Sequence, residues 1–136
     1  MQLKKYSING WCSLKHKSFI VDHCCGKQND LDETVTDATI IKIYPDRCYH
    51  TYHNDTDENL DQTDATTDDF NRRQYYKEYK SDTGFSSSEI FNLIVKTYWI
   101  MINELYDDDR DYISNLSLHT FYFDPNTNRV YAQTDS

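Results

Sequence analysis

Residues 85–106 read FSSSEIFNLIVKTYWIMINELY, and this stretch decides the fold of the chain. Ser86 and Glu89 have the spacing of a capping box, in which the two side chains bond each other's backbone amides at the start of a helix. Phe85 and Ile90 flank the box at the positions of a hydrophobic staple, which fixes how the chain enters the helix. The sequence therefore predicts a helix that begins directly after Ser86.

The composition of this helix places it in the core. Apolar residues occupy eleven of the positions 90–105, and Lys96 and Glu104 are the two charged residues among them. A helix that is apolar on so many sides is buried, and the two charges argue against a membrane span. We therefore predict a long buried helix over residues 87–106, which three aspartates at 107–109 bring to an end.

Strand signals on both sides of this helix predict a small antiparallel sheet that packs on it. β-Branched and aromatic residues are concentrated in short runs that Gly, Pro and Asn residues bound, as is typical of strands. The Asn9-Gly10 pair lies between two short apolar runs and predicts an N-terminal hairpin, because both residues tolerate positive φ. Further strands are expected near residues 17–25, 39–44 and 47–53, and in a C-terminal hairpin over residues 117–133.

The segment that precedes the long helix is strongly polar. Residues 54–69 hold seven acidic residues and no basic residue, and such a stretch buries too little apolar surface to order itself. We expect a mobile acidic loop there, followed by a second helix at about residues 68–80. The fold class is then α+β, with residues 1–136 in a single domain, because the chain is too short for two separate cores.

The net charge of −9 is spread unevenly along the chain. Residues 1–27 hold five lysines and one aspartate, whereas residues 28–69 hold twelve acidic and two basic residues. A chain of this charge is repelled by nucleic acid and by anionic membranes, and is attracted by basic proteins. The N-terminus has no secretory leader pattern, and no apolar run reaches about 18 residues. The sequence therefore predicts a cytoplasmic protein that binds a protein partner, without direct nucleic-acid or membrane binding.

The acidic stretches and the tyrosines near them are the candidate partner-binding residues. Carboxylates gathered on one surface speed association with a cationic partner, and tyrosines are frequent anchors of protein interfaces. A run of charges can equally be a solvated face that only keeps a protein soluble. The candidates are Asp55, Asp57, Glu58, Asp61, Asp64, Asp68, Asp69, Tyr75, Tyr76, Tyr79, Asp107, Asp108, Asp109 and Asp111.

These features favour a small acidic inhibitor over an enzyme. In length, acidity and aromatic content the chain resembles toxin-neutralising immunity proteins and phage proteins that block nucleic-acid-handling defence enzymes. No G-x-S-x-G, P-loop or H-E-x-x-H pattern occurs in it, and these are the patterns that mark common catalytic sites. We therefore expect a protein without enzymatic activity or cofactor that docks on a basic, nucleic-acid-handling partner such as a nuclease or a toxin.

An alternative is a zinc-stabilised interaction module. Eight of the nine Cys and His residues lie between positions 12 and 53, and thiolates and imidazoles are the ligands that zinc prefers. The chain has no C-x₂-C pair, and the competing interpretation is that its thiols are small buried apolar groups. The candidate zinc ligands are Cys12, His16, Cys24, Cys48 and His50.

A third hypothesis is a thiol-dependent enzyme. Cys24 or Cys25 would form a thiolate–imidazole pair with His50 or His53 if the fold brought them together. The spacing of these residues in the sequence does not require that they meet.

Overall fold

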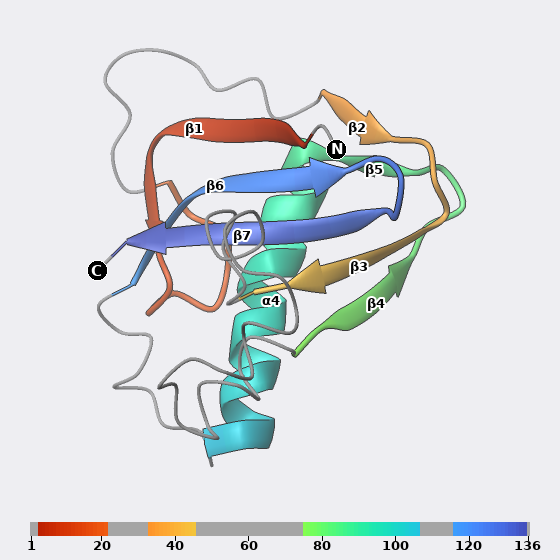
Figure 1. The fold of residues 1–136 in the computed structure, drawn as a ribbon. Helices are drawn as coiled ribbons and strands as arrows, with labels where there is room; N and C mark the ends of the chain where they lie inside the picture. Colours follow the sequence, from red (N-terminus) through yellow and green to blue (C-terminus); the bar gives the residue numbers. More distant parts are fainter. Residues whose placement is uncertain (1–2, 22–32, 46–74, 107–115, 136) are drawn as a thin grey trace, which may run out of the picture.

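The structure is a computed structural model, and it describes residues 3–21, 33–45, 75–106 and 116–135. Its main feature is a five-stranded sheet that packs against one long helix (Figure 1). A second sheet has two short strands, β2 and β5. This arrangement confirms the α+β class. The elements are β1 (Lys4–Ser13), β2 (Thr34–Thr36), β3 (Ile40–Tyr44), β4 (Lys77–Lys80), β5 (Phe85–Ser86), α4 (Ser87–Tyr106), β6 (Ser117–Asp124) and β7 (Arg129–Asp135).

The main sheet has the strand order β1-β6-β7-β3-β4, and its pairing is mixed. β1 pairs with β6, β6 with β7 and β3 with β4 in the antiparallel sense, whereas β3 and β7 run parallel. The expectation of a purely antiparallel sheet is therefore wrong at this one pairing. Parallel neighbours need a long connection, and here the chain between them includes β4, α4 and β6.

The capping box at the start of α4 forms as predicted. The Ser86 amide donates to Glu89 Oε1 at 2.9 Å, and the Glu89 amide donates to Ser86 Oγ at 3.2 Å. Phe85 and Ile90 are both buried, as the hydrophobic staple requires. These local interactions set the start of the helix, which then runs over residues 87–106 as predicted.

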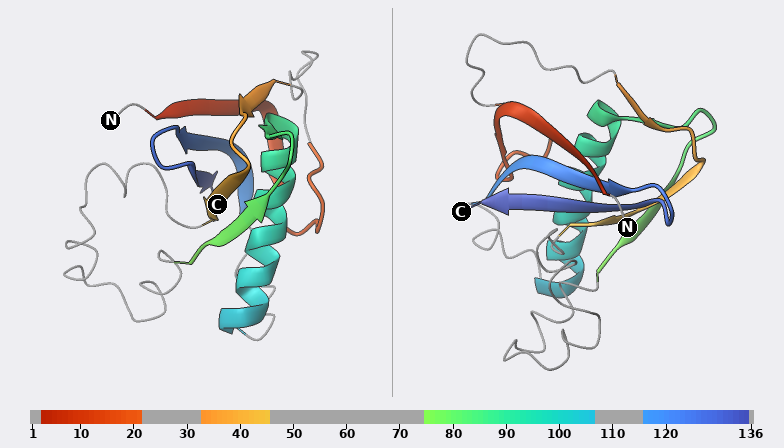
Figure 2. Two further views of the ribbon diagram at one scale, coloured as in Figure 1. Left: turned by 90° about the vertical axis from the view of Figure 1, so that its right-hand side faces the viewer. Right: turned by 45° about the horizontal axis from the view of Figure 1, so that its top comes forward.

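One face of α4 packs on the sheet and forms the core. Figure 2 shows the helix lying across one face of the strands. The Phe91 ring stacks on Phe19 and meets Phe121 edge-on, with 4.9 Å between ring centroids in each pair. Full burial of an apolar side chain of this size contributes about 1.5–3 kcal/mol. Other buried members of the core are Ile8, Cys12, Leu14, Val35, Ile41, Ile43, Phe85, Ile90, Ile94, Val95, Tyr98, Met101, Ile102, Leu118, Phe123, Val130 and Ala132.

The opposite face of α4 is open. Asn92, Lys96 and Asn103 are exposed there, and Trp99 and Ile100 are partly buried. Within the part of the chain that the structure describes, no helix combines the length and the apolar character that crossing a bilayer demands. The helix is therefore buried along the face that meets the sheet and accessible along the other.

The C-terminal hairpin predicted over residues 117–133 is confirmed by β6 and β7. Asp124 opens its turn: Oδ1 accepts a hydrogen bond from the Asn126 amide at 2.9 Å, and its carbonyl accepts one from the Asn128 amide at 2.8 Å. Asn128 has a φ of 57°, in the left-handed region that asparagine tolerates better than most residues. The strand predicted over residues 39–44 is likewise confirmed, as β3.

The predicted N-terminal hairpin is wrong, because Asn9 and Gly10 lie inside one continuous strand, β1. The register between β1 and β6 shifts between Ser7 and Cys12. Gly10 has a φ of 107°, which glycine adopts readily because it has no Cβ. The Asn-Gly pair therefore belongs to an irregularity of the bulge type within a strand, and no turn occurs there.

The helix predicted at about residues 68–80 is wrong where the structure describes it. Residues 77–80 form β4, an edge strand of the main sheet, and residues 68–74 lie outside the described residues. Side chains of β4 alternate between partly buried and exposed, which is the period of two of a strand. Pairing with β3, which is distant in sequence, therefore prevails over the helical spacing of the tyrosines.

The strand predicted near residues 17–25 is wrong over residues 17–21, which form no strand. The indole Nε1 of Trp99 donates to the carbonyl oxygens of Leu14 at 3.0 Å and His16 at 3.3 Å. These bonds hold the chain after β1 against α4, so it leaves the sheet at this point.

Three further predictions concern residues that the structure does not describe. The end of the predicted strand at residues 22–25 lies among them, and so does the predicted strand near residues 47–53. The acidic loop expected over residues 54–69 lies there as well. These three stay predictions.

Candidate functional site

The three tyrosines predicted to contact a partner lie at and just before β4, but they do not face the same way. Tyr75 and Tyr79 are partly buried and bond to side chains of α4. Tyr76 is 44% exposed, and its ring lies against that of Tyr44 on β3, with 5.2 Å between centroids. The structure therefore separates two tyrosines that fasten β4 to the helix from one that is available at the surface.

Glu104, in the last turn of α4, joins Tyr75 and Lys77 in one network. The Tyr75 hydroxyl donates to Oε2 of Glu104 at 2.5 Å, and Nζ of Lys77 lies 3.1 Å from Oε1. The bond from Tyr75, followed by the bond from Lys77, lowers the pKa of the Glu104 carboxyl. Burial, followed by the bond to Glu104, raises the pKa of the Tyr75 phenol. The network fastens the start of β4 to the end of the helix.

Tyr79 makes a second connection between β4 and α4. Its hydroxyl oxygen lies 2.7 Å from Oγ1 of Thr97, and that Oγ1 donates to the Leu93 carbonyl at 2.6 Å. A threonine hydroxyl has one proton, so Tyr79 is the donor to Thr97. Burial raises the pKa of the Tyr79 phenol. Tyr75 and Tyr79 therefore both have roles within the fold that need no partner.

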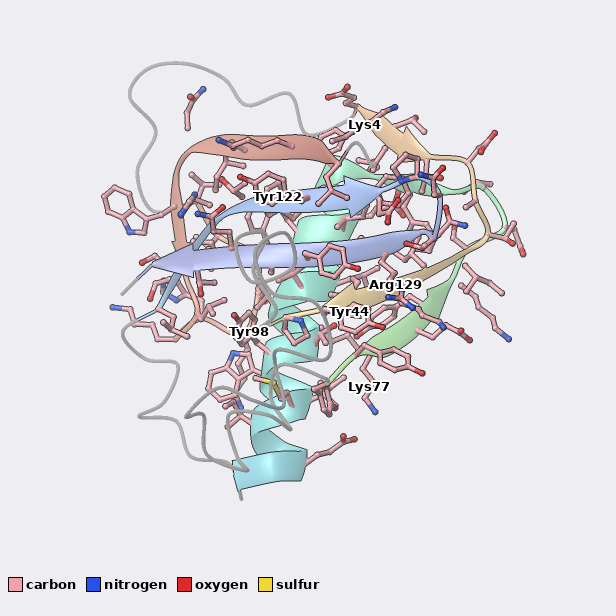
Figure 3. All side chains as sticks on the ribbon, viewed as in Figure 1. Lys4, Tyr44, Lys77, Tyr98, Tyr122 and Arg129 are labelled. Atoms are coloured by element: carbon pink, nitrogen blue, oxygen red, sulfur yellow. The ribbon has the colours of Figure 1, made fainter. Side chains whose placement is uncertain are left out.

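Tyr76 extends a row of tyrosines that crosses the sheet face opposite α4. Tyr122 is paired with Tyr131 across β6 and β7, and Tyr131 is paired with Tyr44 across β7 and β3. The rings of Tyr131 and Tyr44 have centroids 5.4 Å apart. Tyr44 and Tyr131 are buried, so Tyr76 is the most accessible ring of the four. Figure 3 shows Tyr122 and Tyr44 on their strands.

Charged side chains form a second row beside the tyrosines. Arg129 on β7 is paired with Lys42 on β3, and Lys42 is paired with Glu78 on β4. Arg129 Cζ lies 5.6 Å from the ring centroid of Tyr44, and Lys42 Nζ lies 5.3 Å from that of Tyr76. Cations held over aromatic faces in this way contribute about 0.5–1 kcal/mol at exposed sites. This end of the sheet therefore combines an accessible tyrosine with fixed charges.

The eleven acidic candidates, within residues 55–69 and 107–111, lie outside the described residues. The charge of the described part is still informative. It holds nine Lys and Arg residues and eight Asp and Glu residues, a formal charge of +1, whereas the whole chain has −9. The remaining segments therefore carry a charge of −10 by difference, on a framework that is close to neutral.

The points at which the two most acidic segments join the framework lie close together. The chain leaves for residues 46–74 at the end of β3 and returns at the start of β4, and these two ends are adjacent in the antiparallel pair. The chain leaves for residues 107–115 at the end of α4. The hydrogen bond from Tyr75 to Glu104 joins the start of β4 to that end of the helix. We call this junction of β3, β4 and α4 the acidic corner.

The structure describes two of the candidate zinc ligands, Cys12 and His16. Cys12 is fully buried, and its Sγ lies 3.7 Å from the carbonyl oxygens of Ser13 and Ser18. Among the described residues, no three or more His, Cys, Asp or Glu side chains are grouped as a metal site requires. The zinc and thiol-enzyme hypotheses stay predictions, because their other residues lie outside the described part: Cys24, Cys25, Cys48, His50 and His53.

Two surface features of the framework were not predicted. The tyrosine row needed strand pairings that are remote in sequence, although the alternation of Phe121, Tyr122 and Phe123 gives one part of the signal. The second feature is a hollow of about 530 Å³ on the open face of α4. Its helical residues have the spacing i, i+3, i+4 and i+7 of one helix face, which could have been found in the sequence. The hollow is lined by Lys17, Lys96, Trp99, Ile100, Asn103 and Glu104.

Comparison with known proteins supplies no relative from which a function could be transferred. No family model, no curated protein and no solved structure matches the chain.

Proposed function

We propose that this chain is a non-catalytic binding protein that docks its acidic segments and the neighbouring Tyr76 on a basic, nucleic-acid-handling protein and inhibits it. The observation that carries the proposal is the separation of charge between a framework of +1 and a chain of −9. The framework's net charge of +1 offsets little of the −10 that the remaining segments carry. A cationic partner can neutralise it.

The acidic corner gives this charge a defined place of attachment. Residues 46–74 and 107–115 are tethered there at three chain ends. Carboxylates reinforce one another when their separation is within the Debye length, about 8 Å at physiological ionic strength, and the proposal requires that the carboxylates of both segments gather near this corner. Tyr76 lies at the same corner and is 44% exposed, so an aromatic anchor accompanies the charge. An exposed tyrosine is a frequent anchor of protein interfaces, and charge that complements a partner speeds association with it.

Inhibition follows from the kind of surface that such a partner presents. A protein that handles nucleic acid binds the phosphate backbone through Lys and Arg side chains. Carboxylates that dock on the same cations compete with the backbone for them. We therefore expect the nucleic acid and this chain to exclude each other from the partner, and the partner's activity to fall as this chain is added.

Binding of the full chain to a partner captured from host extract, or encoded by a neighbouring gene, tests the proposal. One variant carries Asp107→Asn, Asp108→Asn, Asp109→Asn and Asp111→Asn. Its matched control changes the chain's charge equally within the framework and away from Tyr76, through Glu33→Gln, Asp37→Asn, Asp82→Asn and Glu89→Gln, since glutamine also serves in a capping box. We expect the first variant to lose about tenfold in affinity, which is about 1.4 kcal/mol, and the control to bind like the wild type.

Comparing the affinities of these two variants shows whether binding depends on the acidic corner or only on the net charge of the chain. Equal losses in the two variants would show that only the overall charge matters, and would sink the acidic corner as the docking site. Unchanged binding in both variants would contradict electrostatic docking altogether. A second acidic variant, with Asp55, Asp57, Asp61 and Asp64 changed to Asn, extends the test to the other segment.

The two alternative hypotheses have direct tests, and no observation on the described residues favours either. Elemental analysis of the purified protein tests the zinc-stabilised module, which requires about one zinc per chain. Replacing Cys24 and Cys25 with Ser tests the thiol-dependent enzyme, because a nucleophilic thiol cannot be replaced without loss of activity.

A further inference from the structure

The hollow on the open face of α4 has a rigid floor. The Trp99 indole donates to the carbonyl oxygens of both Leu14 and His16. These bonds fix the orientation of the indole ring and hold the turn after β1 against the helix. Lys17, which follows in that turn, places its Nζ 5.0 Å from the centroid of the Trp99 ring. The hollow is therefore preformed between the turn and the helix, which lowers the cost of ordering side chains on binding.

Two lysines, Lys17 and Lys96, line the hollow. Among residues 3–21, 33–45, 75–106 and 116–135, neither Lys17 nor Lys96 forms an ion pair with a carboxylate. The acidic lining residue, Glu104, already accepts bonds on both of its oxygens from Tyr75 and Lys77. Among the described residues, the hollow therefore presents two ammonium groups without a carboxylate partner, and its one lining carboxylate, Glu104, is already bonded.

Apolar surface lies between these charges. Trp99 and Ile100 are both partly buried, and with Lys96 and Asn103 they form one stripe along the helix. The volume of about 530 Å³ is in the range of sites that accept a ligand or a few side chains. An occupant that fits must therefore combine apolar groups with negative charge.

We propose that this hollow, lined by Lys17, Lys96, Trp99 and Ile100, binds a short acidic protein segment that carries apolar side chains. Its carboxylates would meet the two ammonium groups, and its apolar groups would cover the indole and the isoleucine. Nucleic acid is a poorer occupant, because it needs a longer basic track than two lysines provide. The hollow shares Glu104 with the acidic corner, but its proposed occupant is acidic whereas the proposed inhibited partner is basic, so the two proposals have separate tests.

A peptide titration monitored by Trp99 fluorescence tests the proposal. The full chain carries Trp11→Phe, which leaves Trp99 as its one tryptophan. The probe is an acetylated and amidated peptide of about ten residues, in which aspartates flank two leucines, as charge and apolar complementarity require. We expect a saturable change in emission that weakens as sodium chloride rises from about 50 to 500 mM.

Matched variants locate the binding. The double variant Lys17→Glu, Lys96→Glu is expected to lower the affinity for the peptide by about tenfold or more. Lys4→Glu with Lys5→Glu makes the same charge change on β1, where both lysines are exposed, and is expected to leave affinity within about twofold. A third variant, Ile100→Ser, tests the apolar contact and is expected to lower the affinity for the peptide at every salt concentration.

The contradicting results are equally definite. The proposal fails if emission shows no saturable change up to about 1 mM peptide, the weak limit of specific binding. It also fails if the two double lysine variants lower the affinity for the peptide equally. The same holds if a control peptide with lysines in place of the aspartates binds with equal affinity. Unchanged near-ultraviolet circular dichroism establishes that each variant is folded.

Discussion

At the scale of the residue, Glu104 shows how one carboxylate can join two elements. It accepts bonds from Tyr75 and Lys77, and these donors lie just before and at the start of β4. The lowered pKa of Glu104 means that the folded state binds its proton less tightly than the unfolded state does. Its contribution to stability is therefore present above its ordinary pKa of 4.5 and is lost as the pH falls through the lower folded value.

Replacing Glu104 with Gln tests this linkage. We expect the wild type to be more stable than Glu104→Gln at neutral pH and the difference to vanish below the lowered pKa of Glu104. Lys77 and Glu104 are both more than a third exposed, so solvent screens the pair and the difference at neutral pH should be under about 1 kcal/mol. Urea unfolding at a series of pH values measures it. Glu78→Gln, an exposed residue of β4, is the control, and an equal pH dependence in both variants would contradict the assignment.

At the scale of the element, the start of α4 depends on bonds within four residues. Ser86→Ala removes the bond from the Glu89 amide to Ser86 Oγ and should cost about 1 kcal/mol in the free energy of unfolding. Ser88→Ala makes the same chemical change two residues later, where the side chain takes no part in the capping box, and should change stability by less than about 0.5 kcal/mol. Chemical denaturation of the two variants measures both values. A loss at Ser88 that equals the loss at Ser86 would contradict the capping role.

The turn between β4 and β5 depends on Gly84. Its φ is +85°, and a Cβ at this position would lie 2.8 Å from the Asp37 Cα and closer still to the Thr36 carbonyl oxygen. Gly84→Ala combines an unfavourable φ with a clash against backbone, and should cost about 1–3 kcal/mol. Asp82→Ala in the same turn is the control, since Asp82 is exposed. A melting temperature for Gly84→Ala equal to that of this control would contradict the close packing of the turn on β2.

These elements also show which parts of the fold the sequence could predict. The bounds of α4 and the hairpin of β6 and β7 follow from interactions between residues that are near in sequence, so their patterns are visible in the chain. β4 and the parallel pairing of β3 with β7 depend on partners that are remote in sequence. The Asn9-Gly10 pair was ambiguous, because the same positive φ serves a turn and a bulge.

The candidate site also has parts that the local sequence could predict and parts that depend on contacts remote in sequence. Tyr75, Tyr76 and Tyr79 were found from composition, but the helix predicted for them could not reveal that Tyr76 faces away from α4. The tyrosine row requires the register of three strand pairs, which no local pattern contains. The hollow beside Trp99 requires the turn after β1 to meet the helix, and this contact joins residues about 85 positions apart.

At the scale of the whole molecule, the excess negative charge lies outside the described framework. A soluble protein of −9 could spread its acids evenly over the surface. Here the described framework is near neutral, and the excess lies in segments of which two join the framework at the acidic corner. Counting charges in the sequence could predict the excess, but only the fold could show that these two segments share a corner.

The ionic-strength dependence of the complex between the full chain and its captured partner tests the central claim most directly. The dissociation constant should rise by at least about tenfold between 50 and 500 mM salt, because screening shortens the reach of the carboxylates. The variant with Asn at positions 107, 108, 109 and 111 should show a shallower dependence. A dissociation constant that stays constant over this range, in the wild type and the variant alike, would contradict the account.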